Sequence, residues 1–219
     1  ARRAGAADAQ LIEQPMVAAI GAQLPIDEPI GNMIIDIGGG TSETAVISLG
    51  GIVALEAVRV GSFDIDVAIQ NYVRREHGIA IGERTAEDIK VAIGSAAVTP
   101  DEVQAEVNGR DLMQGLPKTV VLTPEEIRYA IDDTVTQIVQ SVVRCLAKAP
   151  AELAQDFLGR GIHLVGGGGL LRGLAQRIEL ETHVPVLMAD MPLEAVVLGA
   201  GHCIENYDQL KRMFMGQRR

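Results

Sequence analysis

Hydrophobic positions along the chain follow two different spacings, and their order predicts an α/β fold. Residues 33–37, 44–48 and 52–60 are short apolar or β-branched runs joined by glycine turns, which is typical of three consecutive antiparallel strands. Residues 66–77 then carry apolar side chains at helical spacing, with Val67 expected on the buried face. Three strands followed by a helix indicate the beginning of a mixed α/β layer.

The same pattern resumes late in the chain. Residues 162–165 and 185–189 are predicted strands, and residues 170–181 and 193–207 are predicted helices. The predicted order is therefore β-β-β-α-(insert)-β-α-β-α, in a mixed sheet covered by helices.

The interruption, residues 78–158, predicts an inserted α+β subdomain. Capping-box patterns at Thr85 and Thr123 each predict the start of a helix. Two β-prone stretches, 104–107 and 118–122, lie between these helices.

Composition narrows the class of protein. Of 219 residues, 47% are hydrophobic, which is enough to form a sizeable core. With 19 basic and 29 acidic residues the net charge is −10, which argues against nucleic acid as the main partner because phosphate neutralisation needs a basic face. Cys145 and Cys203 lie far apart without metal-ligand spacing, so a reduced, intracellular protein is the simplest interpretation. No apolar run reaches the length of a membrane span.

The turn after the first strand carries candidate chemistry. Asp36 stands near the end of the strand, Gly38 to Gly40 follow, and Thr41 comes next. Bare backbone N–H groups at such a turn can cradle a phosphate, and a carboxylate beside it can hold a hydrated Mg²⁺ ion. The alternative is a plain glycine-rich hairpin with a surface acid.

Three other features allow both a functional and a structural interpretation. Glu13 precedes Pro15 at the predicted start of a helix, where a carboxylate is either a cap or part of a site. The glycines at 166–169 suit either a cofactor against the backbone or close packing of helix on strand. Gly199 and Gly201 inside the last helix each cost about 1 kcal/mol against alanine, which close backbone approach would explain.

Five motifs in this order resemble those of the superfamily of sugar kinases, DnaK-type chaperones and actins, and within it the MreB family of bacterial actins. They are Leu11-Ile-Glu-Gln-Pro-Met-Val-Ala-Ala-Ile-Gly-Ala22, Asp36-Ile-Gly-Gly-Gly-Thr41, Gly82-Glu-Arg-Thr-Ala-Glu-Asp-Ile-Lys-Val-Ala-Ile-Gly-Ser95, His163-Leu-Val-Gly-Gly-Gly-Gly-Leu-Leu-Arg-Gly173 and Pro192 to Gly201. The resemblance implies an actin-like (RNase H-like) ATPase lobe with its core in 32–77 and 159–209. It further implies an inserted small subdomain at 78–158, a remnant of a first lobe with a connecting helix at 1–31, and a basic tail at 210–219.

The resemblance also implies a role for each candidate residue. ATP and Mg²⁺ are the expected ligands, with Asp36 acting on the metal through water and Glu13 positioning the attacking water. The remaining expected contacts are Gly38, Gly39, Gly40 and Thr41 with the phosphates, Glu87 and Lys90 with the ribose and base, and Gly166 and Gly167 beneath the adenosine.

The chain departs from the family pattern at three places. Gln14 stands where a second glutamate is usual, and Gly61-Ser62-Phe63 stands where the family usually has Gly-Gly-Asp. No segment resembles the first phosphate loop, so this chain alone is expected to bind ATP weakly and to hydrolyse little, with ATPase activity belonging to the complete two-lobed protein.

The expected function is that of a filament-forming, cell shape-determining protein that scaffolds peptidoglycan synthesis. Its expected partners are further copies of itself and the cell-wall elongation machinery, in the cytoplasm or peripherally at the inner face of the membrane. The basic segment after Leu210, with Met213 and Phe214, suits either a membrane-surface contact or a frayed terminus. Alternatives are a DnaK-type chaperone ATPase lobe, a sugar-kinase-type phosphotransferase, and a divergent paralogue that does not hydrolyse nucleotide.

Overall fold

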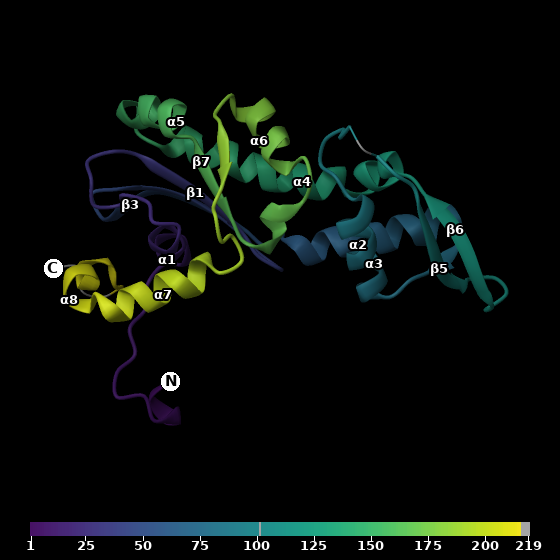
Figure 1. The fold of residues 1–219 in the computed structure, drawn as a ribbon, viewed down its shortest axis with the longest axis horizontal. Helices are drawn as coiled ribbons and strands as arrows, with labels where there is room; N and C mark the ends of the chain where they lie inside the picture. The colour runs from purple at the N-terminus through teal and green to yellow at the C-terminus, as the bar shows by residue number, and fades with distance from the viewer. Residues whose placement is uncertain (101, 216–219) are drawn as a thin grey trace.

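The computed structural model describes residues 1–100 and 102–215, and it has an elongated shape with a sheet near each end (Figure 1). The larger sheet has five strands in the order β3-β2-β1-β7-β8, and the smaller has three in the order β4-β5-β6. The fold is α/β, as the sequence predicts.

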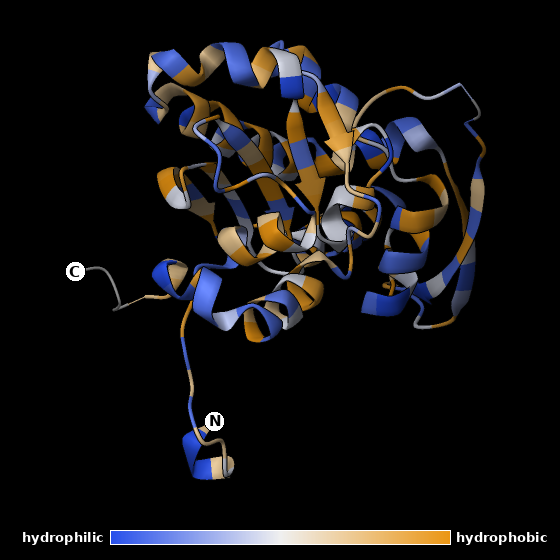
Figure 2. Ribbon diagram, turned by 60° about the vertical axis from the view of Figure 1, so that its left-hand side comes forward, coloured by the Kyte–Doolittle hydropathy of each residue, from blue (hydrophilic) through white to orange (hydrophobic). Residues whose placement is uncertain are grey.

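The three predicted strands of the first hairpin unit are confirmed. They are β1 (Asn32–Ile37), β2 (Ser42–Ser48) and β3 (Gly51–Val58), paired antiparallel. The later strands β7 (Ile162–Val165) and β8 (Val186–Met188) join β1 in parallel, so the sheet is mixed. The central strands β1 and β2 are almost wholly buried, because helices cover both faces of the sheet. Much of the sheet is hydrophobic, drawn in orange in Figure 2.

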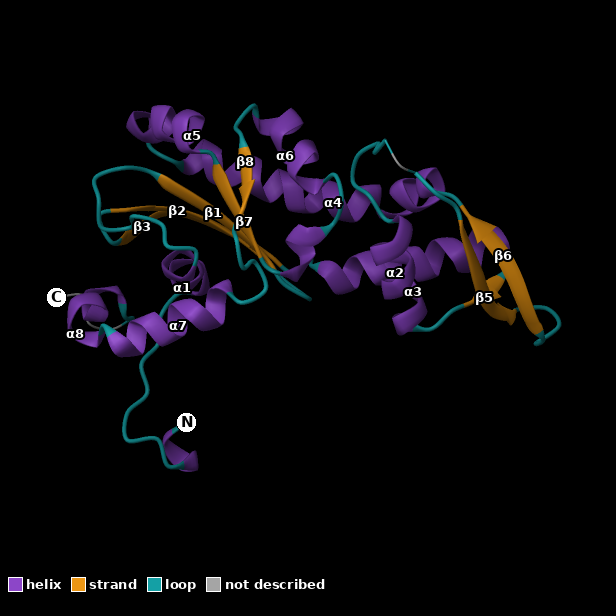
Figure 3. Cartoon of the chain, in the orientation of Figure 1, coloured by secondary structure: helices purple, strands orange, loops and turns teal. Residues whose placement is uncertain are grey.

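Helices cover the two faces separately (Figure 3). On one face lie α1 (Gln14–Gly21) and α7 (Ala195–Glu205), which pack with Ile34 of β1 in one hydrophobic cluster. On the other face, Met33 and Ile35 pack in a second cluster with α4 (Pro124–Lys148) and α6 (Leu174–Thr182). The short helix α5 (Ala154–Arg160), which the sequence analysis did not predict, lies beyond α4.

The smaller sheet belongs to the predicted insert. Its strands are β4 (Ile79–Ala80), β5 (Ala105–Asp111) and β6 (Pro117–Leu122), and it packs beside α2 (Ser62–Tyr72) and α3 (Glu83–Ile93). The capping box that begins α4 is confirmed, because the Thr123 hydroxyl accepts the Glu126 N–H while the Glu126 carboxylate accepts the Thr123 N–H. The capping box predicted at Thr85 is wrong, since the N-cap of α3 is Gly82, three residues earlier.

Three further predictions are corrected. The helix predicted over 66–77 begins at Ser62 and ends in a π-turn, and Val67 is half exposed rather than buried. The helix predicted from residue 170 begins at Leu174, because Gly173 has a positive φ of 74° that the helix cannot include. Met213 and Phe214 are buried in the hydrophobic cluster that contains α1 and α7, so the fraying expected after Leu210 does not reach them.

The end of the predicted tail, residues 216–219, lies outside the described residues. Within the described part of the chain, no helix has the length and apolarity that a membrane span requires.

Helices α1 and α7 touch through backbone rather than through side chains. A Cβ added to Gly199 would lie 1.9 Å from the Val17 carbonyl oxygen, and one added to Gly21 would lie 1.8 Å from that of Ala195. The close approach predicted for Gly199 is therefore confirmed. For Gly201 it is wrong, because no atom lies within 4 Å of its Cβ position.

This difference predicts that alanine substitutions at Gly199 and Gly201 change stability in opposite directions, although both residues lie in α7. Gly199→Ala should force the helices apart and lower the free energy of unfolding by about 1–3 kcal/mol, as overpacking does. Gly201→Ala should raise it by up to about 1 kcal/mol through helix propensity alone. Urea denaturation of the two variants and the parent measures both values, and equal effects would contradict the backbone contact.

Candidate functional site

Three glycine segments meet around the carboxyl end of β1. A Cβ on Gly61 would lie 2.6 Å from the Gly39 carbonyl oxygen, and a Cβ on Gly166 would lie 2.3 Å from the Ile37 carbonyl oxygen. Gly166 also has a positive φ of 82°. The chain can bring these turns together only because none of them carries a side chain at these points.

Asp36 lies at the centre of this arrangement, and its side chain is buried, with 3% exposed. One carboxylate oxygen, Oδ2, accepts a hydrogen bond of 2.8 Å from the Gln14 amide at the start of α1. The other, Oδ1, lies against Gly166, where a Cβ would come within 2.5 Å of it. Burial raises the pKa of Asp36, and the hydrogen bond from Gln14 opposes that rise.

Glu43 is a neighbour of Asp36 that the sequence analysis missed. The two residues are direct partners across the antiparallel pair β1 and β2, so their side chains lie on the same face of the sheet. Burial raises the pKa of Glu43, and the negative charges of Asp36 and Glu13 raise it further. The position of Glu43 could have been predicted from the hairpin, because a turn over residues 38–41 places positions 36 and 43 opposite each other.

Glu13 completes a group of three neighbouring carboxylates. It occupies the N-cap position of α1, yet its side chain makes no capping hydrogen bond, so the cap interpretation is wrong. In the described part of the chain, neither Glu13, Asp36 nor Glu43 forms an ion pair with a basic side chain.

This donor set fits a hydrated cation. Oxygen ligands and uncompensated negative charge are what Mg²⁺ prefers, and it retains several of its waters in proteins. Among the described residues, no three His, Cys, Asp or Glu side chains are arranged to ligate a metal ion directly. The prediction for Asp36 is contact through water.

A cavity of about 420 Å³, here called the glycine-turn pocket, opens beside this group. The predicted residues Gly38, Gly39, Glu87, Lys90 and Gly167 all line it. Its other lining residues are mainly apolar and come from α3 and from the segments around β7 and β8: Val91, Gly168, Leu170, Leu171, Arg172 and Leu193, with Ser62, Phe63 and Ile65 from the start of α2.

Some predicted residues lie outside this lining. Gly40 and Thr41 are exposed at the tip of the turn, and the Thr41 carbonyl accepts the Gly38 N–H at 2.9 Å. Gly166 closes the turn after β7, where its N–H donates to the Pro192 carbonyl. The packing interpretation of Gly166 therefore has direct structural support.

Lys90 is engaged by the protein itself. Its ammonium group donates to the Ser62 hydroxyl at 2.7 Å and forms an ion pair with Asp66 at 2.9 Å. Both charged side chains are about nine-tenths buried. The contact fastens α3 to the start of α2, and a contact of Lys90 with ribose or base stays a prediction.

The Gly61-Ser62-Phe63 segment is attached to the glycine turn after β1, although its sequence departs from the family pattern. The Ser62 N–H donates to the Gly38 carbonyl at 2.9 Å, and the Phe63 N–H donates to the Gly39 carbonyl at 2.7 Å. The segment is thus held to the first glycine turn by backbone hydrogen bonds. These bonds do not depend on the side chains, so they form with Ser62 and Phe63 in place of the usual Gly-Asp.

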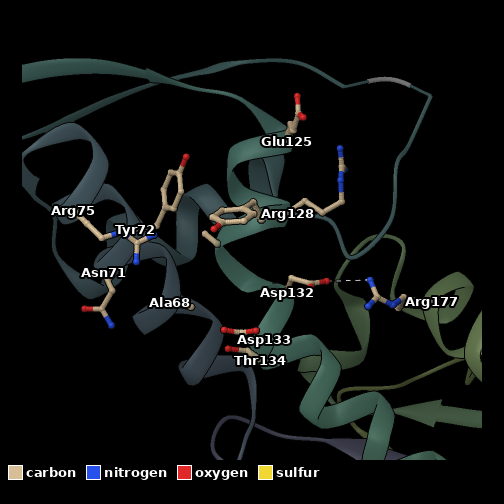
Figure 4. Close-up of a pocket in the computed structure, with 12 residues that line it drawn as sticks. Ala68, Asn71, Tyr72, Arg75, Glu125, Arg128, Asp132, Asp133, Thr134 and Arg177 are labelled. Carbon is tan, nitrogen blue, oxygen red and sulfur yellow. Dashed lines mark hydrogen bonds and ion pairs between the residues drawn. The ribbon is translucent and has the colours of Figure 1, made fainter.

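A larger cavity of about 610 Å³ lies elsewhere, between α2, α4 and α6 (Figure 4). The arginines that line it are paired within the protein: Arg177 with Asp132 at 3.1 Å, Arg128 with Glu102 at 2.7 Å and Arg75 with Glu76 at 2.6 Å. It contains none of the sequence-predicted site residues.

Comparisons with known proteins identify the family of the chain. The family model described as MreB/Mbl protein matches residues 1–212. The chain is 42% identical to the cell shape-determining protein Mbl of Bacillus subtilis (strain 168), covering 97% of this chain and 64% of that protein. It is 48% identical to the cell shape-determining protein MreB of Escherichia coli (strain K12), covering 95% of this chain and 60% of that protein.

Solved structures of MreB5 of Spiroplasma citri are similar in fold. The ADP-bound form superposes with a TM-score of 0.91 at 36% identity, covering 95% of this chain and 63% of that one. The form bound to AMPPNP gives a TM-score of 0.85 and covers 90% of this chain and 59% of that one. The chain thus spans about three fifths of the length of the relatives it matches, and it belongs to the MreB/Mbl family of bacterial actin-like proteins.

Proposed function

We propose that this chain forms the greater part of the nucleotide site of an MreB-type cell shape-determining protein, which binds ATP with Mg²⁺ and assembles into filaments that scaffold peptidoglycan synthesis. The observation that carries the proposal is a glycine turn with unused donors beside a buried carboxylate. In the described part of the chain, the N–H groups of Gly39 and Gly40 make no hydrogen bond. Asp36 lies a few residues before them, near the end of β1.

The phosphates would lie at this turn. Free backbone N–H groups that converge at a glycine turn form a concave anion site, and glycine allows the phosphate to approach them closely. The Thr41 hydroxyl is exposed next to these groups and adds a further donor.

Mg²⁺, when bound, would neutralise part of the phosphate charge. Asp36 would hold it through water, and Gln14 keeps the carboxylate of Asp36 in position by donating to Oδ2. The carboxylate of Glu13, free of any capping bond, can accept a hydrogen bond from a water molecule and so orient that water toward the outer phosphate.

The nucleoside would lie along the glycine-turn pocket. Glu87 is exposed at its rim, where its carboxylate can accept hydrogen bonds from ribose hydroxyls. Leu170 and Leu193 offer apolar surface for the base, and Gly167 leaves room for it. MreB5 of Spiroplasma citri, whose fold this chain shares, is bound to AMPPNP or ADP in its solved structures.

The proposal extends to partners and location. It includes self-association, contact with the cell-wall elongation machinery and a place in the cytoplasm or peripherally at the inner face of the membrane. The relatives named cell shape-determining protein support this part of the proposal.

Gly40→Ala tests the phosphate site without disturbing the fold. No atom lies within 4 Å of the Cβ position of Gly40, so the variant should fold normally. The methyl group would nevertheless stand where the phosphates approach the N–H groups, and ATP affinity in the presence of Mg²⁺ should fall at least about tenfold. Calorimetric titration of the full-length protein measures this affinity.

Gly159→Ala is the matched control, because the Cβ position of Gly159 is equally open and the residue lies in α5, away from the pocket. Its ATP affinity should equal that of the parent. Unchanged affinity in Gly40→Ala would place the phosphates elsewhere.

Asp36→Asn tests the metal part of the proposal and filament formation together. The amide keeps the size of the side chain but removes its charge, so Mg²⁺-dependent ATP binding should weaken. In sedimentation of the full-length protein with ATP and Mg²⁺, the parent should pellet as filaments and Asp36→Asn should stay largely soluble. Asp133→Asn, an exposed acid on α4, should pellet like the parent.

Equal pelleting of Asp36→Asn and the parent would argue against the assigned role of Asp36. A soluble parent protein that transfers phosphate to a small molecule would support the sugar-kinase alternative instead.

A further inference from the structure

Two cavities share a wall next to the proposed nucleotide site. The second cavity, here called the acidic cavity, has a volume of about 580 Å³ and lies between α2 and α3. It is lined by Phe63, Asp66, Val67, Gln70, Glu83, Arg84, Glu87 and Asp88. Phe63 and Glu87 also line the glycine-turn pocket, so these two residues form the boundary between the cavities.

The backbone at Phe63 is held firmly on both sides. Its N–H donates to the Gly39 carbonyl, and that of Ser62 donates to the Gly38 carbonyl. Lys90 of α3 donates to the Ser62 hydroxyl at 2.7 Å and to its carbonyl oxygen at 3.3 Å. The side chain of Phe63 therefore projects from a fixed point.

The ring of Phe63 lies against the phosphate turn. A Cβ on Gly39 would come within 2.5 Å of the ring, so the two are already in van der Waals contact. The side chain is nevertheless 68% exposed, because the rest of the ring faces the two cavities. A large apolar ring that is fixed in place and faces cavities on both sides is suited to contact a ligand.

The position of Glu87 defines which part of a nucleotide would meet this wall. If the carboxylate of Glu87 accepts from the ribose hydroxyls, those hydroxyls point toward the boundary between the cavities. Phe63 stands between them and the acidic cavity. A substituent on a ribose hydroxyl that is directed this way would collide with the ring.

We propose that Phe63 is a specificity-determining residue that limits the size of the ribose end of the nucleotide. It admits nucleotides with free 2′ and 3′ hydroxyls and rejects those that carry a bulky group on either one. This inference rests on the proposed nucleotide site and adds to it the residue that selects among nucleotides.

The test compares two ligands on the full-length protein with Mg²⁺. ATP affinity is measured by calorimetry, and that of 2′/3′-O-(N-methylanthraniloyl)-ATP by fluorescence. The parent should bind ATP at least about tenfold more tightly than the substituted nucleotide, as expected when a pocket wall opposes added bulk. In Phe63→Ala the wall is open, and the ratio of the two affinities should fall close to one.

Two further variants sharpen the result. Phe63→Leu keeps part of the bulk and should give an intermediate ratio. Tyr129→Ala removes another exposed aromatic ring, on α4 and outside both cavities, and should keep the ratio of the parent. Circular dichroism establishes whether each variant is folded. If Phe63→Ala does not fold, the affinity ratio of Phe63→Leu decides whether Phe63 limits the size of the ribose end.

The outcomes separate the two claims. A parent protein that fails to bind ATP overturns the proposed function, and this inference with it. The inference is overturned, and the proposed function stands, if the parent binds ATP but the ratio of the two affinities in Phe63→Ala and in Phe63→Leu equals that of the parent.

Discussion

The structure depends on the contact of backbone with backbone around the end of β1. Gly39 and Gly61 meet there from one side, and Gly166 meets the Ile37 carbonyl from the other. Three chain segments far apart in sequence can converge on one strand only if side chains are absent at the points of contact. The same absence leaves N–H groups of the first turn accessible, so close packing and the proposed ligand binding depend on one feature.

Burial of Asp36 follows from this convergence and gives the site its charge. The carboxylate lies between Gln14 on α1 and Gly166, and its neighbours Glu13 and Glu43 are also acidic. Moving a carboxylate out of water disfavours its charged form unless an opposite charge or a hydrogen bond compensates. Gln14 supplies one hydrogen bond, and a hydrated cation from solution would supply the charge. The backbone contact between Gly199 of α7 and Val17 of α1 holds α1, and with it Gln14, against the sheet.

Local patterns in the sequence predicted the parts of the fold that local forces determine. The hairpin around Asp36 and the capping box at Thr123 each lie within a few residues, and both are confirmed. Lys90 shows the limit of this reasoning, because its partner Asp66 is 24 residues away and no spacing rule connects them. The pair could be found only once α2 and α3 were packed together.

Some features could be read from the sequence only once the arrangement of strands and helices was known. The position of Glu43 opposite Asp36 follows from the length of the glycine turn, yet it becomes meaningful only when the face of the sheet is known. Gly199 and Gly201 look equivalent in sequence, but only the first faces α1. The helix predicted at residue 170 failed because glycine-rich turns allow several backbone paths, and Gly173 adopts the one that delays the helix.

A crystal structure of the full-length protein with AMPPNP and Mg²⁺ tests the central claim most directly. The account predicts phosphate oxygens within hydrogen-bond distance of the Gly39 and Gly40 N–H groups, with a water-coordinated Mg²⁺ ion beside Asp36. It also predicts the ribose at Glu87. Nucleotide in the cavity between α2, α4 and α6, or phosphates remote from the first glycine turn, would contradict it.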